Sequence, residues 1–422
     1  MAGGLDPDLL ARLEGLGVTL GPRAAPRGGG GRPDVMPLEE AVAGRVVEGP
    51  HGACYVSAAC YTLDTRHGDD ALGTALEVPL AAAAGLAGHG AVAGLDVARS
   101  VFLDLETTGL GRDAGTTAFL IGAGRFQGDV FCVRQFFLRD PADERAQLAA
   151  LAEWTGDCHG VITFNGRSFD VPLLAARQAM HRLPRLPAEW PHLDLLPPSR
   201  RLWRARLRSC ALSSLERHVL AFERQDDVPG WLIPERYDLY RRTGDARPLA
   251  GVFRHNVFDV LSMVVLTARL ARACAAPEAV LRHGRDWLGL ARGYEQARDW
   301  NAAVQAYASA LARGLGADEA DEALLRLAGA AKRGGDWPRA RTVWEGLAAA
   351  ARPGRLAPLE ELAKYWEHRA SPARLDRALE IALRARVLVA DGVVRPARGR
   401  RRALEDLDRR VARLRRRLGG TC

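Results

Sequence analysis

The stretch SVFLDLETTGL at residues 100–110 decides the fold. The apolar residues around its two acids predict a buried β-strand. Asp104 and Glu106 stand two residues apart, so both carboxylates point to the same face of that strand. Two like charges on a buried strand repel each other and lose hydration, and a divalent cation relieves both costs. Mg²⁺ and Mn²⁺ prefer such oxygen ligands, so the motif predicts a metal site; the alternative is an exposed strand face.

Two later motifs add acids to this pair. Asp170 stands at the end of NGRSFD in ITFNGRSFDVPLL (162–174), just before a predicted helix, where it is either a site residue or a helix N-cap. In FRHNVFDVLSM (253–263), His255 and Asp259 are four residues apart and share one face of a predicted helix. A surface pair explains the last motif equally well when it is taken alone.

Residues 99–275 alternate between strand and helix patterns. Strands are predicted over 100–107, 116–126 and 129–138, and these three form an antiparallel meander. A helix over 141–158, a strand over 160–166, a helix over 169–183 and a strand over 192–196 follow. The fold class is therefore α/β, with a mixed sheet flanked by helices.

The remaining chain divides into four further segments. Residues 1–40 combine a helix-like stretch with a flexible Gly/Pro linker, and 41–98 form a small strand-rich lead-in. Residues 276–390 contain three helical hairpins, in which Ala303, Ala340 and Ala378 are equivalent, and these resemble tetratricopeptide (TPR) repeats. The alternative is an irregular helical bundle. A basic helix is predicted over 391–422.

The motifs together have the order found in DEDD 3′–5′ exonucleases, which have an RNase H-like fold. The blocks LDLETTGL, NGRSFDVPLL, HLDLL, RRLWRARLRSCALSSLERHVL, RQDDVPGWLIPERY and HNVFDVLSM resemble, more specifically, the YprB-type RNase H-like domain family. The resemblance spans about residues 45–275. It implies a metal-dependent 3′–5′ exonuclease that hydrolyses phosphodiester bonds of DNA or RNA.

The resemblance also assigns roles to the acids and the histidine. Asp104, Glu106, Asp170 and Asp259 become the ligands of two Mg²⁺ or Mn²⁺ ions, and all four are catalytic candidates. His255 becomes the candidate general base. Here the chain departs from the family pattern, because its histidine stands at the spacing that the tyrosine subtype uses.

Other residues are predicted to contact the nucleic acid or to shape the site. The nucleic-acid candidates are Thr107, Thr108, Asn165, Arg200, Arg201 and Arg204. A solvated helix face is the alternative for the arginines. Asp194 is predicted to be a structural helix cap rather than a fifth ligand, and Asp226 and Asp227 are predicted to shape a rim.

Composition and charge narrow the class of protein. Hydrophobic residues make up 48% and charged residues 26%, which excludes wholesale disorder. The seven cysteines are widely spaced without a CxxC pair, so buried thiols are expected rather than a disulfide framework. No signal peptide or membrane span is apparent, so a cytoplasmic protein is expected.

The net charge of +8 is concentrated at the C-terminus. Residues 391–422 hold eleven arginines and four acids, a net charge of +7. The last helix carries an arginine face at Arg409, Arg413, Arg416 and Arg417, opposite an apolar stripe. This face is either a solvated surface or a contact for a phosphate backbone.

Three functions compete with the nuclease. A Rossmann nucleotide-binding domain fits poorly, because GLGRDAG has GxGxxxG spacing. A catalytically inactive nucleic-acid-binding module is a second alternative. The third is an interaction scaffold, in which the helical repeats bind a protein partner and the nuclease fold is vestigial.

Overall fold

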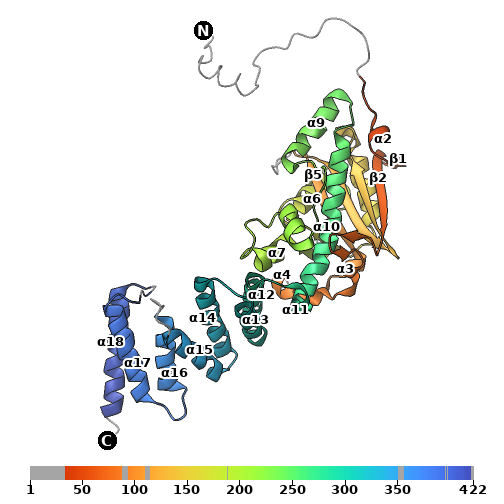
Figure 1. Cartoon of the computed structure of the whole chain (residues 1–422). Coiled ribbons are helices and arrows are strands. Elements are labelled where there is room, and N and C mark those ends of the chain that lie inside the picture. Colours follow the sequence, from red (N-terminus) through yellow and green to blue (C-terminus); the bar gives the residue numbers. More distant parts are fainter. Residues whose placement is uncertain are drawn as a thin grey trace, which may run out of the picture.

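The chain folds into an α/β part followed by a series of helices (Figure 1). The computed structural model describes residues 34–87, 94–109, 115–187, 189–349, 356–394, 396 and 398–419. The helix-like stretch and most of the linker predicted over residues 1–40 lie outside these ranges, as does most of the GLGRDAG turn. None of the described helices is long and apolar enough to cross a membrane.

The α/β part contains a mixed sheet of seven strands in the order β1-β2-β7-β6-β5-β8-β9. The strand β5 pairs antiparallel with β6 and parallel with β8, and β8 pairs parallel with β9. The remaining pairs are antiparallel. The bounds are β1 (Arg45–Gly49), β2 (Gly52–Thr62), β5 (Ser100–Thr107), β6 (Ala118–Gln127), β7 (Val130–Phe137), β8 (Gly160–Thr163) and β9 (His192–Asp194).

The predicted meander is confirmed, since β5, β6 and β7 are adjacent and antiparallel. The two long strands of the predicted lead-in, β1 and β2, extend this same sheet beside β7 and so do not form a separate unit. A small hairpin of β3 (Arg66–His67) and β4 (Asp70–Ala71) lies outside it.

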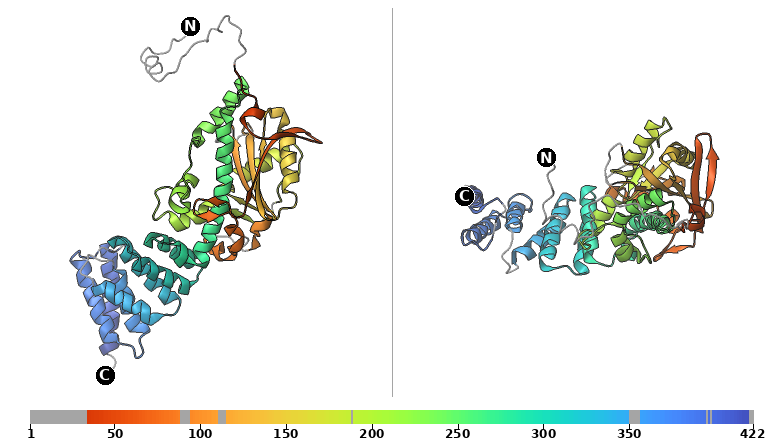
Figure 2. Two further views of the ribbon diagram at one scale, coloured as in Figure 1. Left: turned by 45° about the vertical axis from the view of Figure 1, so that its right-hand side comes forward. Right: turned by 90° about the horizontal axis from the view of Figure 1, so that it is seen from above.

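Helices cover both faces of the sheet (Figures 1 and 2). On one face the long helix α10 (Leu249–Ala275) packs Val260 and Val264 against Phe102 of β5. On the other face α5 (Glu144–Thr155) and α6 (Asp170–Met180) cover the residues of β5 with odd numbers. The alternation of β5 thus decides which of its side chains face α10.

Shorter elements connect these layers. They are α2 (Leu38–Ala41), α3 (Thr74–Glu77), η1 (Leu80–Ala83), α4 (Ala84–Ala87), η3 (Val97–Arg99), η4 (Pro141–Asp143), α7 (Leu196–Trp203), α8 (Leu212–Leu215), η5 (Glu216–Leu220), η6 (Gly230–Leu232), α9 (Ile233–Thr243) and α11 (Pro277–Val280).

The structure corrects the expectation of buried thiols alone. Cys60 of β2 and Cys132 of β7 are joined by a disulfide. They are direct partners in the antiparallel register, with their Cα atoms 4.1 Å apart. Facing side chains on neighbouring strands come this close, although the two residues are 72 apart in sequence. Cys54, Cys158, Cys210 and Cys274 are free and buried.

The C-terminal part is helical, as predicted. The hairpins are α12 (Gly284–Gln296) with α13 (Trp300–Ala312), α14 (Ala317–Arg333) with α15 (Trp337–Ala349), and α16 (Ala357–His368) with α17 (Leu375–Ala390), and α18 (Arg400–Gly419) packs on α17. The three aligned alanines, Ala303, Ala340 and Ala378, are fully buried. Small side chains at equivalent points let each helix pair approach closely, whereas the TPR likeness itself stays a prediction.

Candidate active site

β5 presents the first two acids of the site. Asp104 and Glu106 lie on the face of β5 that also carries Phe102, and so they point toward α10. Both residues are half-buried. The Oε1 atom of Glu106 is buried and has no hydrogen-bond partner among the described residues. Such an unpaired carboxylate oxygen is unfavourable in the isolated protein and is available to a ligand.

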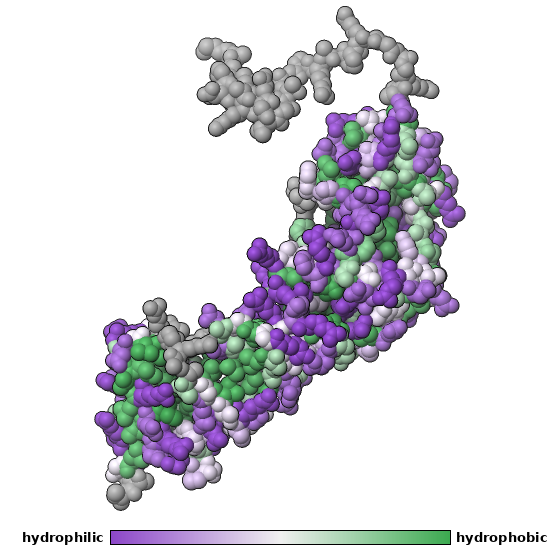
Figure 3. All heavy atoms as spheres, viewed as in Figure 1, coloured by the Kyte–Doolittle hydropathy of each residue, from purple (hydrophilic) through white to green (hydrophobic). Residues whose placement is uncertain are grey.

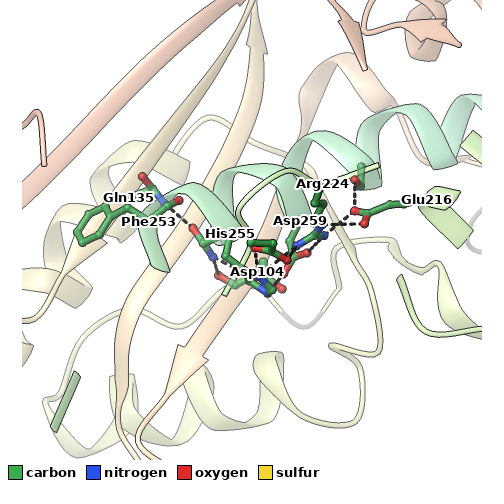
Figure 4. Close-up of polar contacts among 10 residues, drawn as sticks. Asp104, Gln135, Glu216, Arg224, Phe253, His255 and Asp259 are labelled. Carbon is green, nitrogen blue, oxygen red and sulfur yellow. Dashed lines mark hydrogen bonds and ion pairs between the residues drawn. The ribbon is translucent and has the colours of Figure 1, made fainter. Parts of the chain in front are cut away.

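A short amide chain holds Asp104 in place (Figure 4). The fully buried side chain of Asn256 donates its Nδ2–H to Oδ2 of Asp104 at 2.8 Å. Gln135 of β7 in turn donates its Nε2–H to Oδ1 of Asn256 at 2.9 Å and to the carbonyl oxygen of Phe253 at 2.8 Å. Each amide therefore fixes the orientation of the next, and the last one fixes a site carboxylate.

The close approach of α10 to the sheet depends on glycine. Gly122 of β6 lies opposite Asp104 in the register. A Cβ atom at this position would come within 2.2 Å of Oδ1 of Asn256. Only glycine leaves the space that the Asn256 side chain occupies.

The helix α10 brings in His255 and Asp259 on one face, as their spacing predicted. The Nε2 atom of His255 lies 3.3 Å from Oδ2 of Asp259, and its Nδ1 atom lies 2.8 Å from Oδ1 of Asp227. Both ring nitrogens thus contact carboxylates, which suits an imidazolium that donates two hydrogen bonds. Asp227 therefore does more than shape a rim, because it contacts a predicted site residue.

Arg224 was missed at the level of sequence, although it is central to the site. Its guanidinium pairs with Asp259 and with buried Glu216, whose Oε2 accepts from Nε at 2.7 Å (Figure 4). Glu216 also accepts from Ser262, which contacts Nε2 of His67 at 2.7 Å. The arginine was visible in RQDDVPG, but its pairing with Asp259, 35 residues away, depends on the fold.

Phe169 stands at the N-cap position of α6, and Asp170 is the first residue of the helix. The N-cap alternative for Asp170 is thus not supported. Asp194 has the structural role that the sequence predicted: its Oδ1 accepts from the backbone N–H of Asn165 at 2.8 Å and of Leu196 at 3.0 Å. Asn165 adopts a left-handed conformation with φ of 67°, so Asp194 stabilises the turn that leads to Asp170.

The electrostatics show that the four acids act on one another. Burial raises the pKa of Asp104 well above its ordinary value, and the charges of Asp259, Glu106 and Asp170 raise it further. Burial and the charge of Asp259 raise the pKa of Glu106 to about 8. Burial, with the charges of Asp194 and Asp259, raises the pKa of Asp170 to about 7. The site therefore gathers more negative charge than it neutralises.

Asp259 and His255 form the opposite case. Burial alone would raise the pKa of Asp259, but the hydrogen bond from His255 and the charge of Arg224 lower it. Burial alone would lower the pKa of His255, but the hydrogen bond and the charge of Asp259 raise it to about 10. The pair is therefore a carboxylate and an imidazolium at neutral pH, which differs from the neutral imidazole that a general base requires.

The arrangement fits a divalent cation. One ligand atom from each of Glu106, His255 and Asp259 lies within 4.8 Å of the other two. The unpaired oxygen of Glu106 and the raised pKa values of the acids both indicate a site that a cation would stabilise. Asp104 and Asp170 are not in this group. The charges of Asp259 and Glu106 nevertheless raise the pKa of Asp104, and the charge of Asp259 raises the pKa of Asp170.

The predicted nucleic-acid contacts are placed as follows. The hydroxyl of Thr107 donates to the carbonyl oxygen of Gly109 at 2.8 Å, and that of Thr108 accepts from the backbone N–H of Thr117 at 3.1 Å. Both hydroxyls thus stabilise the turn after β5. Arg200 and Arg201 lie on α7 and Arg204 follows directly after it.

The predicted arginine face of the last helix is largely engaged within the chain. Arg413 and Arg417 pair with the buried side chain of Glu367 on α16, and Arg409 pairs with Asp406. All three side chains stay exposed, so the choice between a solvated surface and a phosphate contact remains a prediction. The apolar stripe is confirmed, since Leu407, Val411 and Leu414 are buried.

Comparison with known proteins agrees with this geometry. The model of the RNase H superfamily matches residues 101–271. The chain is also 30% identical, over 333 residues, to the uncharacterized protein YprB of Bacillus subtilis (strain 168). That similarity covers 78% of this chain and 79% of the relative.

Proposed function

Because the chain belongs to the family of the Bacillus subtilis YprB protein and contains an RNase H superfamily domain over residues 101–271, we propose that it is a metal-dependent 3′–5′ exonuclease of the DEDD type. Nucleic acid is its substrate class, and phosphodiester hydrolysis is its reaction. The observation that carries the proposal is the group of Glu106, His255 and Asp259, whose ligand atoms lie within 4.8 Å of one another. Glu106 keeps an unpaired oxygen in this group, and the charges of the group act on Asp104 and Asp170. Mg²⁺ or Mn²⁺ ions bound by these acids would polarise the scissile phosphate and activate water.

The chain's own residues prepare this site. Asn256 orients Asp104 through one carboxylate oxygen. Arg224 and His255 hold Asp259 in its ionised form. His255 is positioned at the cluster as a proton carrier, and its proposed role as the general base requires that it first loses the proton that Asp259 stabilises.

The test is a combined binding and cleavage experiment. We expect Mn²⁺ to raise the melting temperature of the wild-type protein, because the ion binds only the folded state. Single-stranded DNA and RNA labelled at the 5′ end should be shortened from the 3′ end in the presence of Mg²⁺ or Mn²⁺. Asp104→Asn should abolish both effects, whereas the surface variant Asp129→Asn should keep them.

Two outcomes would reject parts of the proposal. Cleavage by Asp104→Asn at the wild-type rate would sink the metal assignment. Release of fragments from within a circular single strand would show an endonuclease and overturn the exonuclease assignment.

A second candidate function has one observation in its favour. Arg224 and His255 already neutralise Asp259, which a purely nucleic-acid-binding module with an inactive site would also show. Such a module would bind oligonucleotides without cleaving them in either metal. The helical part as a scaffold for a protein partner predicts neither affinity nor cleavage.

A further inference from the structure

A basic groove lies where the RNase H-like part meets the helical part. It has a volume of about 400 Å³ and is formed by α7, the residues directly after it, and α12. Four arginines line it: Arg200, Arg201 and Arg204 from the first side, and Arg292 from α12. The other lining residues are two glycines, one alanine and Gln296, so the described lining contains no acid. Figure 3 shows a largely hydrophilic surface over this junction.

The described residues do not balance the charges of this groove. Arg201 donates to the carbonyl oxygen of Leu86, but Arg200, Arg204 and Arg292 form no ion pair with any described residue. The Nε atom of Arg292 is buried and lacks a hydrogen-bond partner among the described residues. Like charges gathered around an unpaired buried donor are unfavourable unless an anion binds between them.

The neighbouring arginine shows that the same junction can supply an acid. Arg206 donates its Nε–H to Oδ1 of Asp286 at 2.8 Å, and Asp286 is a buried residue in the first turn of α12. Arg206, the arginine that joins the two parts at this junction, is therefore paired with a carboxylate. The four groove arginines differ because no described acid lines their groove.

The walls of the groove are fixed in advance. A Cβ atom on Gly289 of α12 would lie 2.3 Å from the carbonyl oxygen of Leu202, and one on Gly293 would lie 2.4 Å from Cδ2 of Leu86. These glycines let α12 pack directly on α7 and α4. The groove is therefore preformed, which lowers the entropic cost of binding.

The groove lies a short way from the acid cluster along one helix. Asp194, whose charge acts on Asp170, binds the first backbone N–H of α7 at Leu196. A helix rises about 1.5 Å per residue, so Arg200 and Arg204 lie roughly 6 and 12 Å along the axis from that end. A strand held at the acids would reach the groove with its next few nucleotides.

From these observations we infer that the groove binds the phosphate backbone of the nucleic-acid strand whose end occupies the acid cluster. A site that binds a base by stacking would need an aromatic ring, and the described lining has no aromatic residue. The contact is therefore independent of sequence. Arg292 makes the helical part a contributor to substrate binding, and the inference rests on the proposed function for the position of the strand end.

The experiment measures binding without cleavage, in an Asp104→Asn background. Fluorescent single-stranded oligothymidylate and oligouridylate are titrated at several salt concentrations, as a tetranucleotide and as a strand several times longer. We expect the long strand to bind more tightly than the tetranucleotide. Arg200→Ala with Arg204→Ala should reduce this difference and flatten the slope of log affinity against log salt by about 1.4, since each lost contact with a single strand contributes about 0.7. Arg292→Ala should act in the same direction, and because it is partly buried its melting temperature is checked first.

The matched control is Arg182→Ala with Arg185→Ala, which removes the same charge from exposed positions after the C-terminal end of α6. This control should keep the salt slope and the length preference of the parent. Equal weakening by both double variants would overturn the groove, because only net charge would then matter. If the wild-type protein cleaves nothing but the groove variants still flatten the slope, the groove stands and the exonuclease assignment fails.

Discussion

At the scale of single residues, the folded protein raises the pKa values of some site acids and lowers the pKa of another. Glu106 and Asp170 are acids that the folded protein prefers to keep protonated. Asp259 is an acid that it keeps ionised, through Arg224 and His255. A carboxylate kept ionised beside acids with raised pKa values gives a cation one preformed anchor and several ligands that ionise as it binds.

The stability of the metal-free protein should fall as the pH rises. Glu106 and Asp170 have folded-state pKa values of about 8 and about 7, well above the ordinary values. Between about pH 4 and pH 8 the folded state therefore binds protons that the unfolded state has lost. The pKa of His255, raised to about 10, acts in the same direction from about pH 6.5 upward. Urea unfolding in EDTA should show this decline, and Glu106→Gln with Asp170→Asn should reduce it.

The same protons should compete with the metal. We expect the Mn²⁺-induced rise in melting temperature to be larger at pH 8 than at pH 6, because the ligands must lose their protons before they bind the ion. A rise that is equal at both pH values in the wild-type protein, or that persists in Asp104→Asn, would contradict this expectation.

At the scale of elements, the contact between α10 and β6 sets the geometry of the site. The replacement Gly122→Ala would place a Cβ atom within 2.2 Å of Asn256 and would displace the amide that orients Asp104. We expect a loss of about 1–3 kcal/mol in the free energy of unfolding, as is typical of overpacked cores. The metal-dependent cleavage should fall further than this loss of stability explains.

A glycine of a helix provides the control for this prediction. A Cβ atom added to Gly346 of α15 would meet open space, so Gly346→Ala should preserve cleavage and leave stability equal or slightly higher. Chemical denaturation and cleavage rates are measured on both variants. A Gly122→Ala protein with wild-type activity would show that the Asn256 contact is not needed.

The sequence was sufficient for elements with strong local patterns. The apolar runs of β5, β6 and β7 and the i, i+4 spacing of His255 and Asp259 predicted both the meander and the shared helix face. The pairing of Arg224 with Glu216 was not predictable, because Arg224 lies in an irregular loop eight residues after Glu216, the first residue of η5, and no periodic pattern relates the two. The same holds for the disulfide of Cys60 with Cys132, since strand order, rather than spacing, makes them neighbours.

At the scale of the whole molecule, buried ion pairs join segments that are distant in sequence. Arg206 and Asp286 link the RNase H-like part to α12. Glu367 of α16 is 2% exposed and accepts from Arg410, Arg413 and Arg417 of α18. The basic helix thus serves first to neutralise a buried acid, a role that periodicity along α18 alone does not reveal.

The last prediction concerns this acid. Arg410→Ala with Arg413→Ala should lower the free energy of unfolding by about 1–3 kcal/mol, because Glu367 then loses hydrogen-bond donors while it stays buried. Glu367→Gln in the same background should restore part of the loss, since the amide carries no charge. Arg415→Ala with Arg416→Ala, at exposed positions, should leave stability within about 0.5 kcal/mol of the wild type. Urea unfolding of the four proteins measures these differences. If both double-arginine variants were equally stable, Glu367 would not need its arginine partners, and the arginines of α18 would again be available for a phosphate backbone.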